Sequence, residues 1–110
     1  MNRELIYTTT VEGFEINLYA MPEYDDPKGH FATGDDDFDE DICQRIYSED
    51  LLWFTACVTA SRAGVELGTD YLGACCYESF DDFIKDAYFD DMTAEAIREA
   101  KQTLAKLVES

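Results

Sequence analysis

The chain has 110 residues, a hydrophobic content of 46% and a net charge of −17, from 25 acidic and 8 basic residues. This hydrophobic content is too high for a disordered acidic chain, and the length suits one hydrophobic core, so we expect a single folded domain over residues 1–110. The charge argues against direct binding to nucleic acid or to an anionic membrane, because so few basic residues cannot neutralise phosphate groups.

The N-terminal part of the chain predicts a β-hairpin. Residues 4–11 are rich in β-branched and aromatic types, and residues 14–20 alternate apolar with polar side chains. With Glu12-Gly13 between them, these segments predict two antiparallel strands that bury one face. Pro22 is expected to end the second strand, and a polar loop without periodicity follows over residues 23–37.

The middle of the chain predicts two helices and a strand. Residues 39–47 form a short amphipathic pattern, and Ser48 has the side chain of a good N-cap for the helix after it. Residues 51–63 are apolar or small nearly all round, which predicts a helix buried in the middle of the domain. The aromatic, small and apolar types of residues 70–77 predict a third strand.

Residues 80–91 predict a further helix, which Ser79 begins in a pattern that resembles a capping box. Thr93 is expected to cap the last helix. The inward-facing residues of that helix are predicted to be Ile97, Ala100, Leu104, Leu107 and Val108. Together the elements predict an α+β fold, in which a three-stranded antiparallel sheet packs against three to four helices. The sheet would contain the N-terminal hairpin and the strand near residues 70–77.

The N-terminus and the cysteines bear on the compartment. The first ten residues, MNRELIYTTT, lack the apolar core of a signal peptide, and no run reaches transmembrane length, so the expected location is the cytoplasm. Cys43, Cys57, Cys75 and Cys76 should then be reduced. Since they form no C-x-x-C pair, we interpret them as small apolar residues of the core.

Negative charge is concentrated in two places. Residues 34–41 read GDDDFDED, and in the helix expected over residues 80–91 Asp82, Asp86 and Asp90 recur every four residues. Such spacing makes them neighbours on one helix face, where like charges repel. By contrast, residues 93–110 are neutral overall. The candidate binding residues are Asp25, Asp26, Asp35, Asp36, Asp37, Asp39, Glu40, Asp41, Asp81, Asp82, Asp86, Asp90 and Asp91.

No motif predicts catalysis, a cofactor or a metal site. An EF-hand loop that begins at Asp35 or at Asp37 would require a bidentate Glu at its last position, where Ile46 and Ser48 stand instead. The single histidine, His30, has no Ser or Cys partner at a recognisable spacing. Carboxylate pairs are so abundant in this chain that a pair by itself does not indicate a glycosidase. We therefore expect a protein that is not an enzyme.

The acidic concentrations favour a surface that imitates a polyanion. An extended chain advances about 3.3 Å per residue, close to the charge spacing of about 3.4 Å along one DNA strand. Residues 35–41, if extended, would approach that charge density, and the aspartates of residues 80–91 would add a second row. Such a surface suits the basic groove of a nucleic-acid-binding protein.

Residues 50–88 resemble small acidic accessory proteins of bacteriophages and mobile elements, in the features Trp53-Phe54, Tyr71-Leu72-Gly73 and Glu78-Ser79-Phe80-Asp81-Asp82-Phe83. In size and charge the chain resembles anti-CRISPR proteins and DNA-mimic anti-restriction proteins. The resemblance implies stoichiometric inhibition in a bacterial host's cytoplasm, with a CRISPR effector or a restriction enzyme as the partner.

Three alternatives share the same composition. An immunity protein or antitoxin against a basic nuclease toxin would use the same electrostatics on another partner. A small interaction subunit would self-associate through its neutral C-terminal helix or its exposed aromatic residues. A highly charged domain whose acids only face water would need no partner at all.

Overall fold

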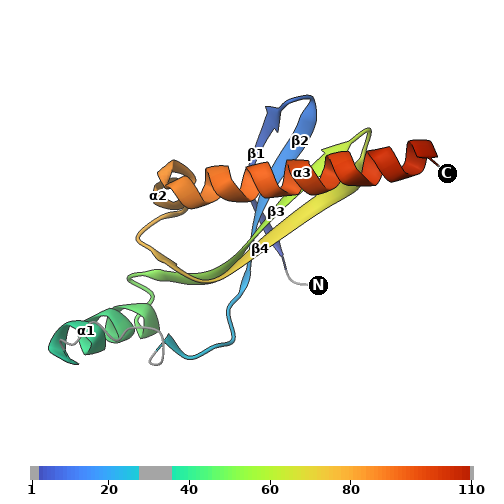
Figure 1. Cartoon of the computed structure of the whole chain (residues 1–110). Helices are drawn as coiled ribbons and strands as arrows, with labels where there is room; N and C mark the ends of the chain where they lie inside the picture. The colour runs from blue at the N-terminus through green and yellow to red at the C-terminus, as the bar shows by residue number, and fades with distance from the viewer. Residues whose placement is uncertain (1–2, 28–35, 110) are drawn as a thin grey trace.

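The structure is a computed structural model that describes residues 3–27 and 36–109. It is an α+β fold in which the described residues form one four-stranded antiparallel sheet and three helices (Figure 1). The strands follow one another in chain order across the sheet. In sequence, the elements are β1 (Glu4–Val11), β2 (Phe14–Pro22), α1 (Asp36–Tyr47), β3 (Leu52–Arg62), β4 (Val65–Tyr77), α2 (Phe80–Lys85) and α3 (Ala87–Glu109).

The predicted N-terminal hairpin is confirmed. β1 and β2 pair antiparallel from the turn, where Val11 lies opposite Phe14. Glu12 and Gly13 both have positive φ angles, 52° and 82°, as a two-residue hairpin turn with the twist of the strands requires. Because the alternation holds from Phe14 to Leu18, the side chains of Phe14, Ile16 and Leu18 are buried, whereas the polar residues between them are not. The strand ends at Pro22, the residue that was expected to end it.

The helix predicted over residues 51–63 is wrong, because this segment is the strand β3. It lies between β2 and β4, and every residue from Ala56 to Ser61 is buried. A central strand that is buried on both faces loses the alternation that marks a half-exposed strand, so its sequence looks like that of a buried helix. Ser48 is not an N-cap either: it follows α1, and its N–H donates to the Gln44 carbonyl (2.9 Å).

The sheet therefore has four strands rather than the three predicted. The segment predicted as a strand over residues 70–77 is the second part of the longer strand β4. A two-residue turn joins β3 to β4, and its residues Ala63 and Gly64 have φ angles of 54° and 78°. This is a second hairpin of the same kind as the first.

The helices predicted after residue 79 differ in their bounds. The one predicted over residues 80–91 ends at Lys85, because Asp86 takes an extended conformation (φ −78°, ψ 154°). α3 then runs through Thr93, the predicted cap, which is buried within the helix. Leu107 and Val108, predicted to face inward, are 62% and 86% exposed. Both belong to the last turns of α3, whose C-terminal end extends past the β3–β4 hairpin (Figure 1).

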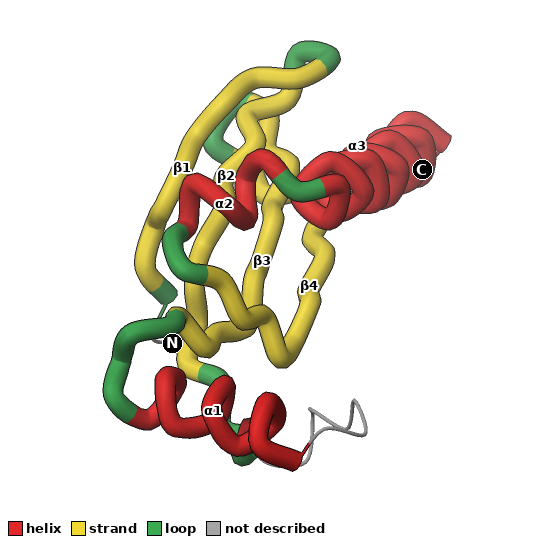
Figure 2. Tube along the Cα trace, turned by 90° about the vertical axis from the view of Figure 1, so that its left-hand side faces the viewer, coloured by secondary structure: helices red, strands yellow, loops and turns green. Residues whose placement is uncertain are grey.

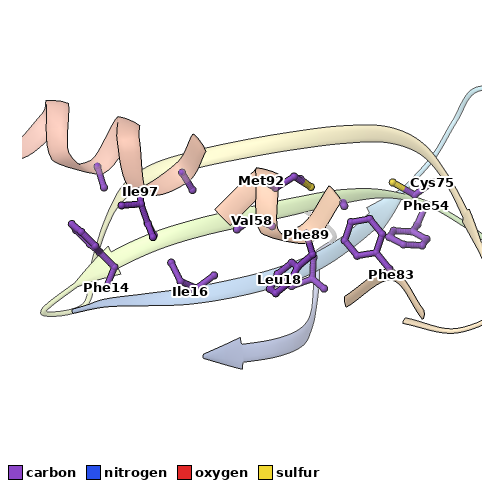
Figure 3. Packing of buried hydrophobic residues seen from close by; sticks show 14 residues of the cluster. Phe14, Ile16, Leu18, Phe54, Val58, Cys75, Phe83, Phe89, Met92 and Ile97 are labelled. Atoms are coloured by element: carbon purple, nitrogen blue, oxygen red, sulfur yellow. The ribbon is translucent and has the colours of Figure 1, made fainter. Parts of the chain in front are cut away.

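The core lies between one face of the sheet and the helices α2 and α3 (Figure 3). Phe83 of α2 is fully buried, and its ring lies 5.6 Å from that of Phe54 on β3. α3 approaches β4 closely at Gly68, where a Cβ atom would lie 1.9 Å from the Ala96 carbonyl oxygen. The residues of this buried cluster are Phe14, Ile16, Leu18, Phe54, Ala56, Val58, Ala60, Cys75, Phe83, Phe89, Met92, Ala96, Ile97 and Ala100.

The cysteines are free thiols, of which Cys43, Cys57 and Cys75 are buried and Cys76 is half-buried. Burial raises the pKa of the Cys75 thiol to about 11, so this side chain stays neutral at physiological pH. Their interpretation as small apolar residues is confirmed for the three buried ones.

Candidate interaction surface

Charge is divided unequally along the molecule, which measures 56 × 26 × 22 Å. We call residues 23–27, 36–51 and 78–92 the acidic half: they contain α1, α2 and the start of α3, with sixteen acidic and two basic residues. The remaining described residues, the mixed half, have eight acidic and five basic ones. In Figure 1, α1 and α2 lie toward one end of the molecule, whereas the C-terminus lies at the other.

The acids of residues 36–41 lie on a helix, so the prediction of an extended row is wrong for this segment. They occupy the first turns of α1, where the rise is about 1.5 Å per residue and neighbouring side chains point to different sides. Carboxylates near a helix N-terminus interact favourably with the helix dipole, and Cys43 and Ile46 anchor the helix by burial. Asp35 lies outside the described residues.

Asp25 and Asp26 lie at the opposite end of α1 from these acids. Trp53 on β3 donates its indole N–H to the Asp25 carbonyl (2.9 Å), and the Tyr47 hydroxyl donates to the Asp26 carboxylate. This contact with Asp26 raises the pKa of Tyr47 to about 12. Ten residues separate Tyr47 from Asp37 on the helix, a distance of about 15 Å.

The predicted stripe of Asp82, Asp86 and Asp90 does not exist, because no single helix contains all three residues. Asp86 links α2 to α3 and accepts a hydrogen bond from the Tyr77 hydroxyl (2.8 Å). Burial, with a further contribution from Asp86, raises the pKa of Tyr77. The Asp86 carboxylate therefore belongs to the internal structure.

The remaining acids of this segment are exposed near the starts of two helices. Asp81 and Asp82 lie in the first turn of α2, where the Asp82 N–H donates to the Ser79 hydroxyl (3.2 Å), which confirms Ser79 as the N-cap. Asp90 and Asp91 lie in the early turns of α3. All four side chains point to solvent.

An ion pair connects the end of α1 to the segment that precedes α2. Arg45, in the last turn of α1, lies 3.6 Å from the Glu78 carboxylate. In Figure 2, α1 lies at the bottom of the molecule and α2 lies above it, against the sheet. This ion pair thus links the two segments of the acidic half that carry the acids of α1 and of α2.

Basic side chains of the mixed half pair with glutamates of that half. Arg98 pairs with Glu95 (2.7 Å) and lowers the pKa of that carboxyl. Two further pairs cross between elements, Arg3 with Glu66 (3.3 Å) and Lys101 with Glu12 (2.9 Å). These pairs engage glutamates outside the predicted binding set.

Glu23 is an acid outside the predicted binding set. Residues 73 and 74 of β4 together lie opposite Thr55, which makes a β-bulge, and Ala74 has a φ of 55°. The Glu23 carboxylate accepts hydrogen bonds from the Ala74 N–H and from the Thr55 hydroxyl. The bulge supplies the Ala74 donor, and no sequence pattern marks a bulge at this position.

Within residues 3–27 and 36–109, no three His, Cys, Asp or Glu side chains converge as a metal ion would require. His30 lies outside these residues. None of the described helices has both the length and the apolar character to cross a membrane.

Comparison with protein-family models, with curated proteins and with solved structures finds no match.

Proposed function

We propose that this protein is a non-enzymatic inhibitor, encoded by a phage or mobile element, that binds a host nucleic-acid-binding protein stoichiometrically. Its acidic half occupies the basic groove of that partner in place of nucleic acid. The observation that supports this proposal is the unequal division of charge, with sixteen acidic residues against two basic ones in the acidic half.

Solubility alone does not account for that division. The mixed half shows that this chain can intersperse both signs of charge, with five basic residues among eight acidic ones. Like charges at close spacing on α1 cost some tenths of a kcal/mol per pair, about 0.2–0.5 kcal/mol. This repulsion becomes favourable for binding only when a cationic partner neutralises the acids.

The physical consequences are fast association and strong dependence on salt. Complementary potentials steer two proteins together and raise the association rate, and added salt screens this attraction. Because the Debye length is about 10 Å at 0.1 M salt, acids spread over the acidic half act together only at low ionic strength.

Two variants that remove the same number of charges test the proposal. The acidic-half variant carries Glu40→Gln, Asp41→Asn and Asp91→Asn. The mixed-half variant, its matched control, carries Glu4→Gln, Glu15→Gln and Glu99→Gln. All six side chains are exposed, and the two variants have equal net charge.

Inhibition of DNA cleavage is then measured on purified CRISPR effector complexes and restriction enzymes, at low and high salt. We expect the parent protein to inhibit at stoichiometric concentration and less well at high salt. The acidic-half variant should lose about tenfold in potency, since three contacts at about 0.5 kcal/mol each amount to one order of magnitude. Absence of inhibition across these enzymes, or equal potency of the two variants, contradicts the proposal.

A further inference from the structure

The two edges of the sheet differ in how well they are protected. The edge strand β4 has two register irregularities against β3, one near Phe54 and one near Ala60. The charged side chain of Asp70 lies on the face of β4 that α3 covers, in the field of Glu95 and Glu99. Bulges, inward-pointing charges and a covering helix are the features by which proteins prevent an edge strand from pairing with another chain.

The edge strand β1 has far less of this protection. Its one register irregularity lies between Leu5 and Tyr7, and the pairing with β2 is regular from Tyr7 to Val11. No charged residue occurs between Leu5 and Val11, in a chain with a net charge of −17. Tyr7, Thr8 and Thr10 are exposed, and among the described strands only β2 pairs with β1. The outer side of β1 therefore presents backbone donors and acceptors to solvent.

We propose that β1 pairs antiparallel with β1 of a second copy of this chain, so that two sheets become one sheet of eight strands. This inference goes beyond the proposed inhibitory function and does not depend on it. A two-fold axis at Thr9 places Thr8 opposite Thr10 of the second copy and Tyr7 opposite Val11. Such an interface is isologous, because both copies contribute the same residues to it.

Self-complementarity selects a second copy over a basic partner. Between Leu5 and Val11 the edge has no charge that would attract a cationic strand, whereas threonines opposite threonines and an aromatic residue opposite a β-branched one are favourable cross-strand pairs. The register matters for the acids at the ends of β1. An axis at Thr8 would place Glu4 opposite Glu12, but the axis at Thr9 places Glu12 opposite Ile6 and avoids that repulsion.

The arrangement also keeps the negative charges of the two copies apart. β2 ends, and β3 begins, toward the acidic half, whereas the β1–β2 turn lies at the other end of these strands. Antiparallel pairing near this turn therefore directs the two acidic halves in opposite directions. Salt should strengthen the pairing because it screens the remaining repulsion, which is the reverse of its effect on binding to a basic partner.

Charges placed at Thr8 and Thr10 test the interface and its register together. The like-charge variant, Thr8→Lys with Thr10→Lys, places two lysines opposite each other twice, although it lowers the overall repulsion between the copies. The opposite-charge variant, Thr8→Asp with Thr10→Lys, differs from it at one residue and places opposite charges across both pairs. In both variants the lysine that replaces Thr10 lies opposite Glu15 of its own chain, so the two hairpins are matched at that pair. Gln102→Lys with Ala105→Lys adds two charges on the exposed side of α3 as a control.

Sedimentation equilibrium over a range of protein and salt concentrations gives the dissociation constant, and circular dichroism confirms folding. We expect the parent to dimerise more tightly as salt rises. The like-charge variant should weaken the dimer about tenfold or more, and the opposite-charge variant should restore it, while the α3 control binds at least as well as the parent. A parent that stays monomeric at all concentrations overturns the proposal. So does a like-charge variant that dimerises like the parent, or an opposite-charge variant that binds no better than the like-charge one.

Discussion

The helix α1 and the helix α2 both carry exposed acids, yet they are held in the molecule in different ways. α2 inserts the fully buried Phe83 into the main core, next to Phe54 and Tyr77. α1 contributes no residue to that core, and its buried residues Cys43 and Ile46 lie outside it. The comparison teaches that the density of acidic residues on a helix does not depend on how the helix is buried. Substitutions can therefore change the charge of the acidic half without changing its fold.

The two halves show the same independence on a larger scale. In the mixed half, α3 packs on the sheet and also carries basic residues that pair with glutamates. The acidic half keeps its charge on helix starts and on connecting segments, where carboxylates favour the helix dipole and stay hydrated. Its aromatic residues, rather than its charges, should therefore determine its stability.

The largest expected effect comes from removing the aromatic anchor of α2. Phe83→Ala should lower the free energy of unfolding by about 3–5 kcal/mol, because it deletes a fully buried ring and leaves a cavity. Phe38→Ala on α1 is the matched change, and it should cost no more than about 0.5 kcal/mol, since the Phe38 side chain is 52% exposed. Urea denaturation of both variants measures the difference. Equal losses would show that the two helices are anchored alike.

A smaller effect should separate two aspartates that the sequence pattern treats as equivalent. Asp86→Ala removes the acceptor of the part-buried Tyr77 hydroxyl, and we expect a loss of about 1–3 kcal/mol. Asp90→Ala, on the exposed side of α3, should change stability by about 0.5 kcal/mol or less. Thermal denaturation of the two variants distinguishes them. If Asp86→Ala leaves the stability unchanged, the Asp86 carboxylate has no structural role and belongs with the exposed acids.

The success of the sequence predictions depends on whether a segment is half-buried. The alternation of β2 and the cap at Ser79 are local signals, and both features occur where they were predicted. β3 is buried on both faces, so its composition resembles that of a buried helix. Its pairing with β2 and β4 is a long-range property that the local sequence does not indicate. The same error removed the second hairpin from the predicted sheet.

The candidate site was predicted as a composition but not as a geometry. Every acidic run was visible in the sequence, whereas the break at Asp86 depends on how α2 and α3 pack against β4. The hydrogen bonds from Tyr77 to Asp86 and from Tyr47 to Asp26 join residues of different elements. Periodicity alone contains no information about such contacts, so the predicted stripe could not be rejected before the structure was known.

Charge removal should have a modest effect that differs between the halves. The acidic-half variant Glu40→Gln/Asp41→Asn/Asp91→Asn should gain about 0.5–1 kcal/mol in stability at low salt, because these residues lie in the second turns of α1 and α3, where removing a charge relieves repulsion at little cost to the interaction with the helix dipole. The mixed-half variant Glu4→Gln/Glu15→Gln/Glu99→Gln should gain less. High salt should remove the difference by screening. Guanidinium is itself a salt, so urea denaturation is the suitable measurement, and equal gains would contradict the division of charge.

The smallest expected effect is confined to one phenol at the end of α1. The Asp26 carboxylate raises the pKa of Tyr47 from 10.0 to about 12. A pKa that is raised in the folded state favours folding below the unfolded value, and this contribution is lost as the pH rises through the folded one. The contact should therefore hold Asp26 against α1 up to about pH 10 and release it near pH 12. In an ultraviolet titration, Tyr77 also titrates late because its pKa is raised, so the measurement is the number of late-titrating tyrosines. Asp26→Asn should move one tyrosine toward its ordinary pKa, and Tyr47→Phe should remove one late-titrating tyrosine. If neither variant has fewer late-titrating tyrosines than the parent, Asp26 is not held by this helix.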